Sequence, residues 1–170
     1  MDGPTRELLT AKCVRVITEN FERLPAHEGA KGIPAKYLAA ISAGLSTTLD
    51  PQIAALYVFD ENYWKRRCIE QLGWHKCQVV EHGLTWKQLF FEHHVAKQLE
   101  DFEVPEAERG GSGDSAAFAS LLTLLRSCQD YVFTLQVRQL LSHPNMQAVC
   151  ACLPNLACLD VTYGVRSIGN

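Results

Sequence analysis

A short phrase repeats near the C-terminal end of the chain. Leu135-Gln136-Val137 returns as Leu159-Asp160-Val161, so Leu135 and Leu159 are separated by a period of 24 residues. That period lies within the roughly 20 to 29 residues of one leucine-rich repeat, a unit that adds a short strand to a stacked array. One unit cannot bury its apolar face alone, so about three or more are usually stacked. We therefore expect residues 116–170 to be the start of an α/β leucine-rich-repeat solenoid with short parallel strands, whose array is truncated.

The alternation of side chains along the two strands predicts which residues are available to a partner. Successive residues of a strand point to opposite faces. The leucines and valines of the repeated phrase are therefore expected to point into the core. The polar residues between and after them are expected to line the concave surface as contact residues: Gln136, Arg138, Asp160 and Thr162.

The first part of the chain has the spacing of amphipathic helices. Between Thr5 and Leu24, steps of three and four residues predict a helix with one apolar face. The apolar residues of that face are Leu9, Cys13, Val16, Ile17, Phe21 and Leu24. Further helices are expected to begin near Pro34, at Asp50-Pro51 and after Asp60, where Gly73 stops the last of them. Residues 1–109 are thus expected to form a helical N-terminal domain, and the fold class is mainly α.

Two local patterns complete the predicted order of elements. Thr85-Trp86-Lys87-Gln88 is a T-x-x-Q capping box, which predicts a helix that begins at Trp86. The glycines and acidic residues around 110–115 predict a flexible loop between two domains. Beyond it we expect a helix over Ala117 to Leu125, a strand over Tyr131 to Val137 and a helix over Pro144 to Leu153.

The composition argues against several functional classes. A net charge of −3 on 170 residues gives no global reason to bind nucleic acid or an anionic membrane. The longest apolar stretches are far shorter than the roughly 20 residues of a spanning helix. Seven cysteines are an odd count scattered through apolar contexts, which favours reduced, buried thiols over a disulfide framework. We therefore expect a cytosolic protein, or one in a compartment continuous with the cytosol.

No metal, cofactor or catalytic constellation is expected. Cys68, His75, Cys77 and His82 follow the spacing C-x6-H-x-C-x4-H, which matches none of the usual structural zinc patterns. His93-His94 has no nucleophile or paired acid at a fitting distance, and neighbouring helical residues cannot readily share one ligand. We therefore expect a protein that is not an enzyme.

Lys65-Arg66-Arg67 is a compact basic run on a predicted helix. Two interpretations stay open for it: a solvated helix face, or a docking patch for an acidic partner. These three residues join the four strand residues as candidate partner-binding residues.

Three groups of residues carry a family resemblance: Asp60-Glu61-Asn62-Tyr63-Trp64, His82-Gly83-Leu84-Thr85-Trp86-Lys87, and Phe90-Phe91-Glu92-His93-His94. They resemble the N-terminal region of the t-complex-associated testis-expressed protein family, the leucine-rich-repeat subunit (subunit five) of the nexin-dynein regulatory complex. The resemblance runs from about Ile33 to the end and is strongest between Asp60 and Phe102.

The resemblance implies a non-enzymatic structural and regulatory subunit of the ciliary or flagellar axoneme. Such a subunit would be a protein-protein scaffold that helps to link doublet microtubules and to regulate dynein-driven motility. Its implied partners are other subunits of the complex, in a hetero-oligomeric assembly, with doublet microtubule or dynein components as further candidates. The implied location is the cytoplasm and cytoskeleton of the cilium, and no cofactor is implied.

A second resemblance has a different functional consequence. Ile33-Pro34, Leu49-Asp50-Pro51 and Tyr63-Trp64-Lys65-Arg66-Arg67, with the apolar residues between them, are similar to an F-box. This resemblance implies an F-box-like N-terminal domain that binds a Skp1-like or elongin-like protein, as in a substrate adaptor of a cullin ubiquitin ligase. An F-box ancestry with the ligase role lost would reconcile the two resemblances.

Overall fold

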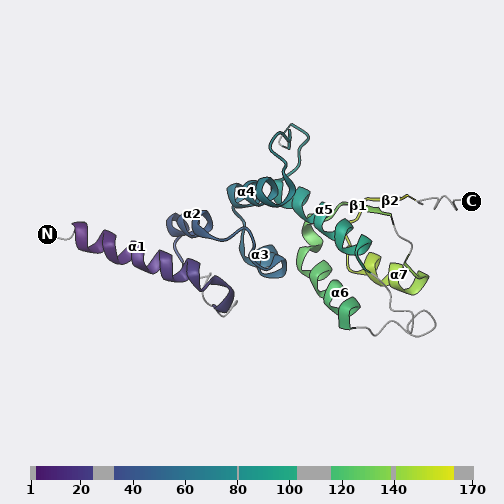
Figure 1. The fold of residues 1–170 in the computed structure, drawn as a ribbon, viewed down its shortest axis with the longest axis horizontal. Helices are drawn as coiled ribbons and strands as arrows, with labels where there is room; N and C mark the ends of the chain where they lie inside the picture. The colour runs from purple at the N-terminus through teal and green to yellow at the C-terminus, as the bar shows by residue number, and fades with distance from the viewer. Residues whose placement is uncertain (1–2, 25–32, 80, 103–115, 139–140, 163–170) are drawn as a thin grey trace, which may run out of the picture. The chain divides into compact units, whose positions relative to one another are not determined.

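The computed structural model describes residues 3–24, 33–79, 81–102, 116–138 and 141–162. It is mainly helical, with one short parallel sheet (Figure 1). The chain forms two compact units, Met1–Gln78 and Val79–Asn170. In the described ranges, no helix combines the length and the apolar character that crossing a membrane needs.

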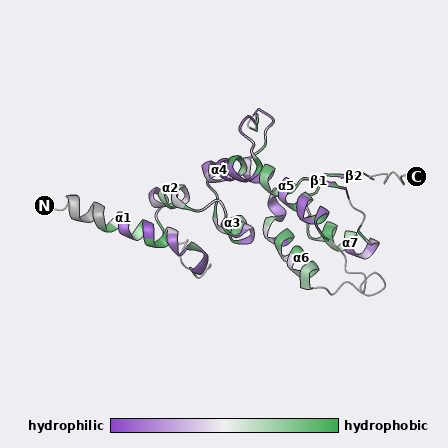
Figure 2. Ribbon diagram, viewed as in Figure 1, coloured by the Kyte–Doolittle hydropathy of each residue, from purple (hydrophilic) through white to green (hydrophobic). Residues whose placement is uncertain are grey.

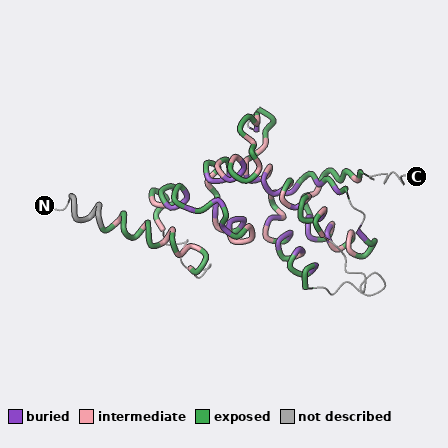
Figure 3. The backbone as a smooth tube through the Cα atoms, viewed as in Figure 1, coloured by how far each residue is buried: buried purple, intermediate pink, exposed green. Residues whose placement is uncertain are grey.

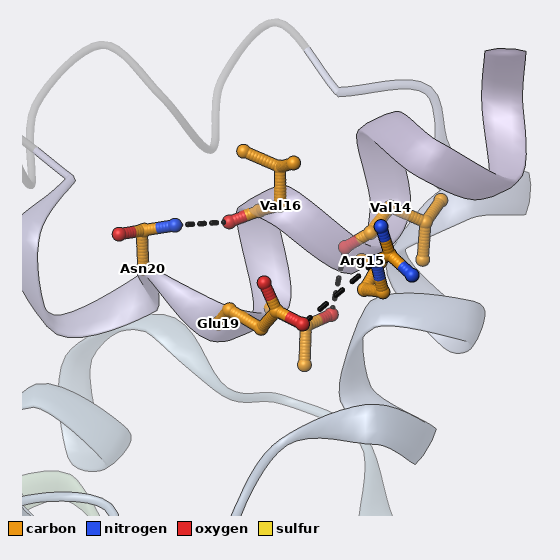
Figure 4. A network of polar contacts seen from close by, with 6 residues as sticks. Val14, Arg15, Val16, Glu19 and Asn20 are labelled. Carbon is orange, nitrogen blue, oxygen red and sulfur yellow. Dashed lines mark hydrogen bonds and ion pairs between the residues drawn. The ribbon is translucent and has the colours of Figure 1, made fainter.

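The described elements of the first unit are helical. They are α1 (Gly3–Glu19), the 3-10 turn η1 (Phe21–Arg23), α2 (Ala35–Gly44), α3 (Pro51–Tyr57) and α4 (Glu61–Leu72). Helix α1 packs on α2, and α2 packs on α4. At the end of α1, the Asn20 side chain donates to Val16 O at 2.8 Å (Figure 4). Arg15 Nε lies 3.8 Å from Glu19 Oε1 in the same helix.

The second unit combines helices with the sheet. Its elements are α5 (Trp86–Glu100), α6 (Ala116–Cys128), η3 (Gln129–Tyr131), β1 (Thr134–Val137), α7 (His143–Ala151) and β2 (Cys158–Val161). Helix α5 packs against β1, η3 and α6, and α6 also packs against α7.

The local capping signals of the sequence are confirmed. Asp50 accepts hydrogen bonds from the N–H groups of Gln52 and Ile53, at 2.9 and 3.1 Å, at the start of α3. Asp60 accepts from Asn62 N at 2.9 Å at the start of α4. Each carboxylate satisfies a backbone donor that the first turn of a helix cannot satisfy internally.

The end of α4 and the start of α5 also lie where the sequence predicts them. Gly73 adopts a left-handed φ of 70° and ends α4, as its missing Cβ allows. Thr85 Oγ1 accepts from Gln88 N at 3.0 Å at the start of α5. The Gln88 amide donates to the Glu92 side chain, one turn further along the same helix.

The predicted apolar face of α1 is not a single buried face. Leu9 and Val16 are 63% and 53% exposed, and Cys13 between them is also exposed. Ile17 and Phe21 are half-buried. Figure 2 shows apolar residues within the described part of α1. Helix α1 therefore carries apolar residues on two sides, and only the side that contacts α2 is covered in the described structure.

The core of the first unit surrounds α4. Tyr63 and Trp64 are 1% and 0% exposed, with their rings edge to face at 5.2 Å. The Trp64 indole N–H donates to the carbonyl of Val58 at 3.0 Å, so the buried ring also satisfies its polar atom. The remaining buried apolar residues of this unit are Ile41, Leu45, Leu49, Ala54, Ala55, Val58 and Cys68.

The sheet of the second unit confirms the prediction of short parallel strands. Strands β1 and β2 are parallel, and Leu135 pairs with Leu159 in register. The 24-residue period of the sequence is therefore also the offset between paired strand residues. Leu135 and Val137 are completely buried, and their neighbours Thr134 and Gln136 are exposed, as the alternation predicts.

The compact units divide the chain differently from the predicted domains 1–109 and 116–170. Helix α5, which the sequence analysis assigns to the first domain, packs within the second unit. The predicted loop 110–115 lies outside the described residues. The domain boundary at that loop stays a prediction.

Candidate partner-binding surfaces

The sheet presents a polar face made of side chains from both strands. Gln136 and Asp160 are register partners and are both exposed, so they lie side by side on this face. Arg138 and Thr162 are exposed just beyond the strand ends, where Thr162 N donates to Val137 O at 3.0 Å. All four predicted contact residues are thus exposed at one sheet. Their role in binding stays a prediction.

The prediction that the leucine and valine of each strand point into the core is wrong for β2. Leu159 is 40% exposed and Val161 is half-buried, whereas both were expected to point into the core. Strand β2 is the outer strand of a sheet that has two strands in the described residues, so its side chains have a neighbouring strand on one side only. Figure 3 shows the contrast between buried residues in β1 and exposed ones in β2.

Arg138 connects the strand face to helix α5. Its Nε lies 3.4 Å from Glu100 Oε1, and the two side chains are 72% and 34% exposed. An ion pair this exposed contributes little to stability because water screens it. Most of the Arg138 side chain therefore stays exposed to solvent.

Helix α5 covers the other edge of the sheet. The carbonyl of Phe133 accepts hydrogen bonds from the β2 side, from Ala157 N and Cys158 N. In a trans peptide the next N–H points the opposite way, and Thr134 N accordingly donates to Glu92 Oε1 at 2.9 Å. Phe133 N donates to the same oxygen at 3.1 Å. Glu92 thus accepts from the Thr134 N–H at the start of this edge, a donor to which a further strand could otherwise bond.

A buried lysine stands beside this contact. Lys87, in the first turn of α5, is 2% exposed, and its ammonium lies 4.0 Å from the centre of the Tyr131 ring. A cation over an aromatic face is favourable, and more so when both groups are out of water. Lys87 therefore supports the junction of α5 with η3. Lys87 and Glu92 enter the sequence motifs only as members of longer runs, and no contact is predicted for either, because their partners lie about 40 residues away.

The basic run of α4 is not a solvated face. Lys65 is exposed, but Arg66 is half-buried and Arg67 is 2% exposed. Arg66 donates to the carbonyls of Ser42, Ala43 and Leu45 at the end of α2. Carbonyls at a helix end have no partner within the helix and attract cations. The solvated-face interpretation is therefore wrong for Arg67, and Arg66 is bound to the end of α2.

Arg67 has a defined internal role. Its Nη2 donates to the carbonyl of Leu49 at 2.8 Å, and its Nη1 donates to the Tyr63 hydroxyl at 3.1 Å. The Tyr63 hydroxyl donates in turn to Ser46 O at 3.1 Å. Burial lowers the pKa of the Arg67 guanidinium, and the nearby Tyr63 opposes that shift. These bonds fasten the segment between α2 and α3 to α4 and leave Lys65 as the exposed member of the run.

The cysteines and histidines do not converge on a site. Cys68 is buried, Cys77 is half-buried, and His75 and His82 are exposed. Across the described ranges, no three Cys, His, Asp or Glu side chains form a group that could hold a metal ion. His94 is half-buried and stacks on Phe90 at 5.3 Å, while His93 is exposed, so the two imidazoles have different surroundings.

Comparisons with known proteins give one consistent result. No family model matches the chain. A protein of Chlamydomonas reinhardtii named dynein regulatory complex subunit 5 is 32% identical over 158 residues, which are 92% of this chain and 37% of that protein. The proteins of the same name from Mus musculus and Homo sapiens are 30% and 34% identical, over 95% and 79% of this chain. The chain spans between 24% and 37% of the length of these relatives.

Proposed function

Because these relatives support the dynein regulatory complex subunit 5 family for this chain, we propose that it serves in the dynein regulatory complex of the ciliary or flagellar axoneme. Its role there is structural and regulatory, without an active site of its own. The observation that carries this proposal is similarity over 92% of the chain to a relative of that name.

The scaffold role is the finer part of the proposal. The chain would bind other subunits of the complex and so help to link doublet microtubules and to regulate dynein-driven sliding. The unit of β1, α7 and β2 would be the first repeat of a leucine-rich solenoid. Its 24-residue register offset and alternating burial in β1 support this assignment.

The sheet face is the proposed contact surface of the scaffold. Gln136 and Asp160 lie next to each other at its centre, with Arg138 and Thr162 at its end. Concave strand faces of solenoids are extended surfaces suited to protein partners. Lys65 belongs to a separate candidate surface on α4, and Arg66 and Arg67 would support it from inside.

An affinity-tagged copy of the chain in motile ciliated cells tests the proposal. We expect the tag to fractionate with isolated axonemes and to recover other subunits of the dynein regulatory complex. Asp160→Arg should release the chain from axonemes, because it reverses the charge at the centre of the sheet face. Glu81→Arg, an equal reversal at an exposed residue outside the sheet, is the matched control. A tag that is absent from axonemes contradicts the proposal.

The F-box-like adaptor is the alternative function. Leu38 on α2 and Leu56 on α3 are 40% and 49% exposed, as partner-facing residues of such a domain would be. The same purification distinguishes the two functions. Recovery of Skp1 or elongin C in place of axonemal subunits favours the ligase adaptor.

A further inference from the structure

We draw no further inference here: the strongest candidate, the outer edge of β2 with the exposed side chain of Leu159 and the half-buried side chain of Val161, would take a further parallel strand and so belongs to the leucine-rich solenoid already proposed.

Discussion

The buried charged side chain of Arg67 holds several parts of the first unit together. Its guanidinium contacts the Leu49 carbonyl, the Tyr63 hydroxyl and, at 5.6 Å, the Trp64 ring. Lys65, two residues earlier on the same helix, is exposed. The position of each residue on the helix, and not its type, decides which of the two becomes structural.

Arg67→Ala is therefore expected to destabilise the chain by about 1–3 kcal/mol, because it leaves the buried Leu49 carbonyl without its donor. Lys65→Ala should change stability by less than about 0.5 kcal/mol. Urea denaturation followed by circular dichroism measures both. Equal effects of the two substitutions would contradict the internal role of Arg67.

In the second unit, two substitutions of Glu92 can be compared in the same way. Glu92→Ala removes the acceptor of three hydrogen bonds, from Gln88, Phe133 and Thr134, and should cost about 1–3 kcal/mol. Glu92→Gln keeps a side-chain oxygen and should cost less, since neutral hydrogen bonds are weaker than charge-assisted ones. Amide hydrogen exchange at Thr134 is the specific readout. Thr134 should exchange faster in the alanine variant, and unchanged protection would count against the edge contact.

At the scale of elements, α4 ends because of one residue. Gly73 has a φ of 70°, and a Cβ there would meet nothing within 4 Å, so backbone conformation and not crowding favours glycine. Gly73→Ala should destabilise by about 1–2 kcal/mol, the usual penalty of the left-handed conformation. Gly73→Asn should cost less, because asparagine tolerates this region. Thermal unfolding of the two variants checks this order, and a tolerated alanine would refute it.

Local sequence signals predict where a helix begins and ends better than they predict which of its residues are buried. The Asp50, Asp60 and Thr85 caps and the Gly73 stop act within one turn of backbone, so the sequence contains all of their partners. The buried sides of α1 and of the Lys65 to Arg67 run depend on segments about twenty or more residues away. Periodicity shows that a helix has an apolar side but does not name the segment that will cover it. The solvated-face interpretation failed for Arg67 for that reason, and the docking-patch interpretation of the run stays a prediction.

The strand prediction was right for the pairing of the two strands and wrong for the burial of β2. The 24-residue period yields the parallel register, because a repeat places equivalent residues side by side. The exposure of Leu159 could not be predicted in the same way, since it depends on whether another segment packs against β2. The edge contact of Glu92 joins residues 41 and 42 positions apart and has no local pattern.

At the scale of the whole molecule, the reactivity of the cysteines shows which residues are buried in each unit. Burial raises the pKa of the Cys68 and Cys128 thiols to about 12, from a usual value of 9.0. Cys13 and Cys158 are exposed. Since the thiolate is the reactive form, iodoacetamide should label Cys13 and Cys158 in the native protein. It should reach Cys68 and Cys128 only after denaturation, as peptide mass spectrometry can determine. Rapid native labelling of Cys68 would contradict the buried core of the first unit.

The same thiols predict alkaline destabilisation. The folded state holds both protons up to about pH 12, whereas the unfolded chain loses them near pH 9. The folded state therefore binds more protons between these values, and the free energy of unfolding falls as pH rises through this window. Below about pH 9 these two groups should cause no pH dependence. Urea titrations at pH 8 and pH 10.5 measure the difference, and a Cys68→Ala, Cys128→Ala variant should show a smaller one.

The contact with the Glu92 carboxylate makes the two edges of the two-stranded sheet different. Because Glu92 accepts the Thr134 N–H and α5 packs against β1, an extended segment that pairs with this edge of β1 would have to displace the Glu92 contact. A further strand of the proposed solenoid would therefore add beside β2, on the side away from α5. The contact with α5 would also protect the start of β1 from edge-to-edge association.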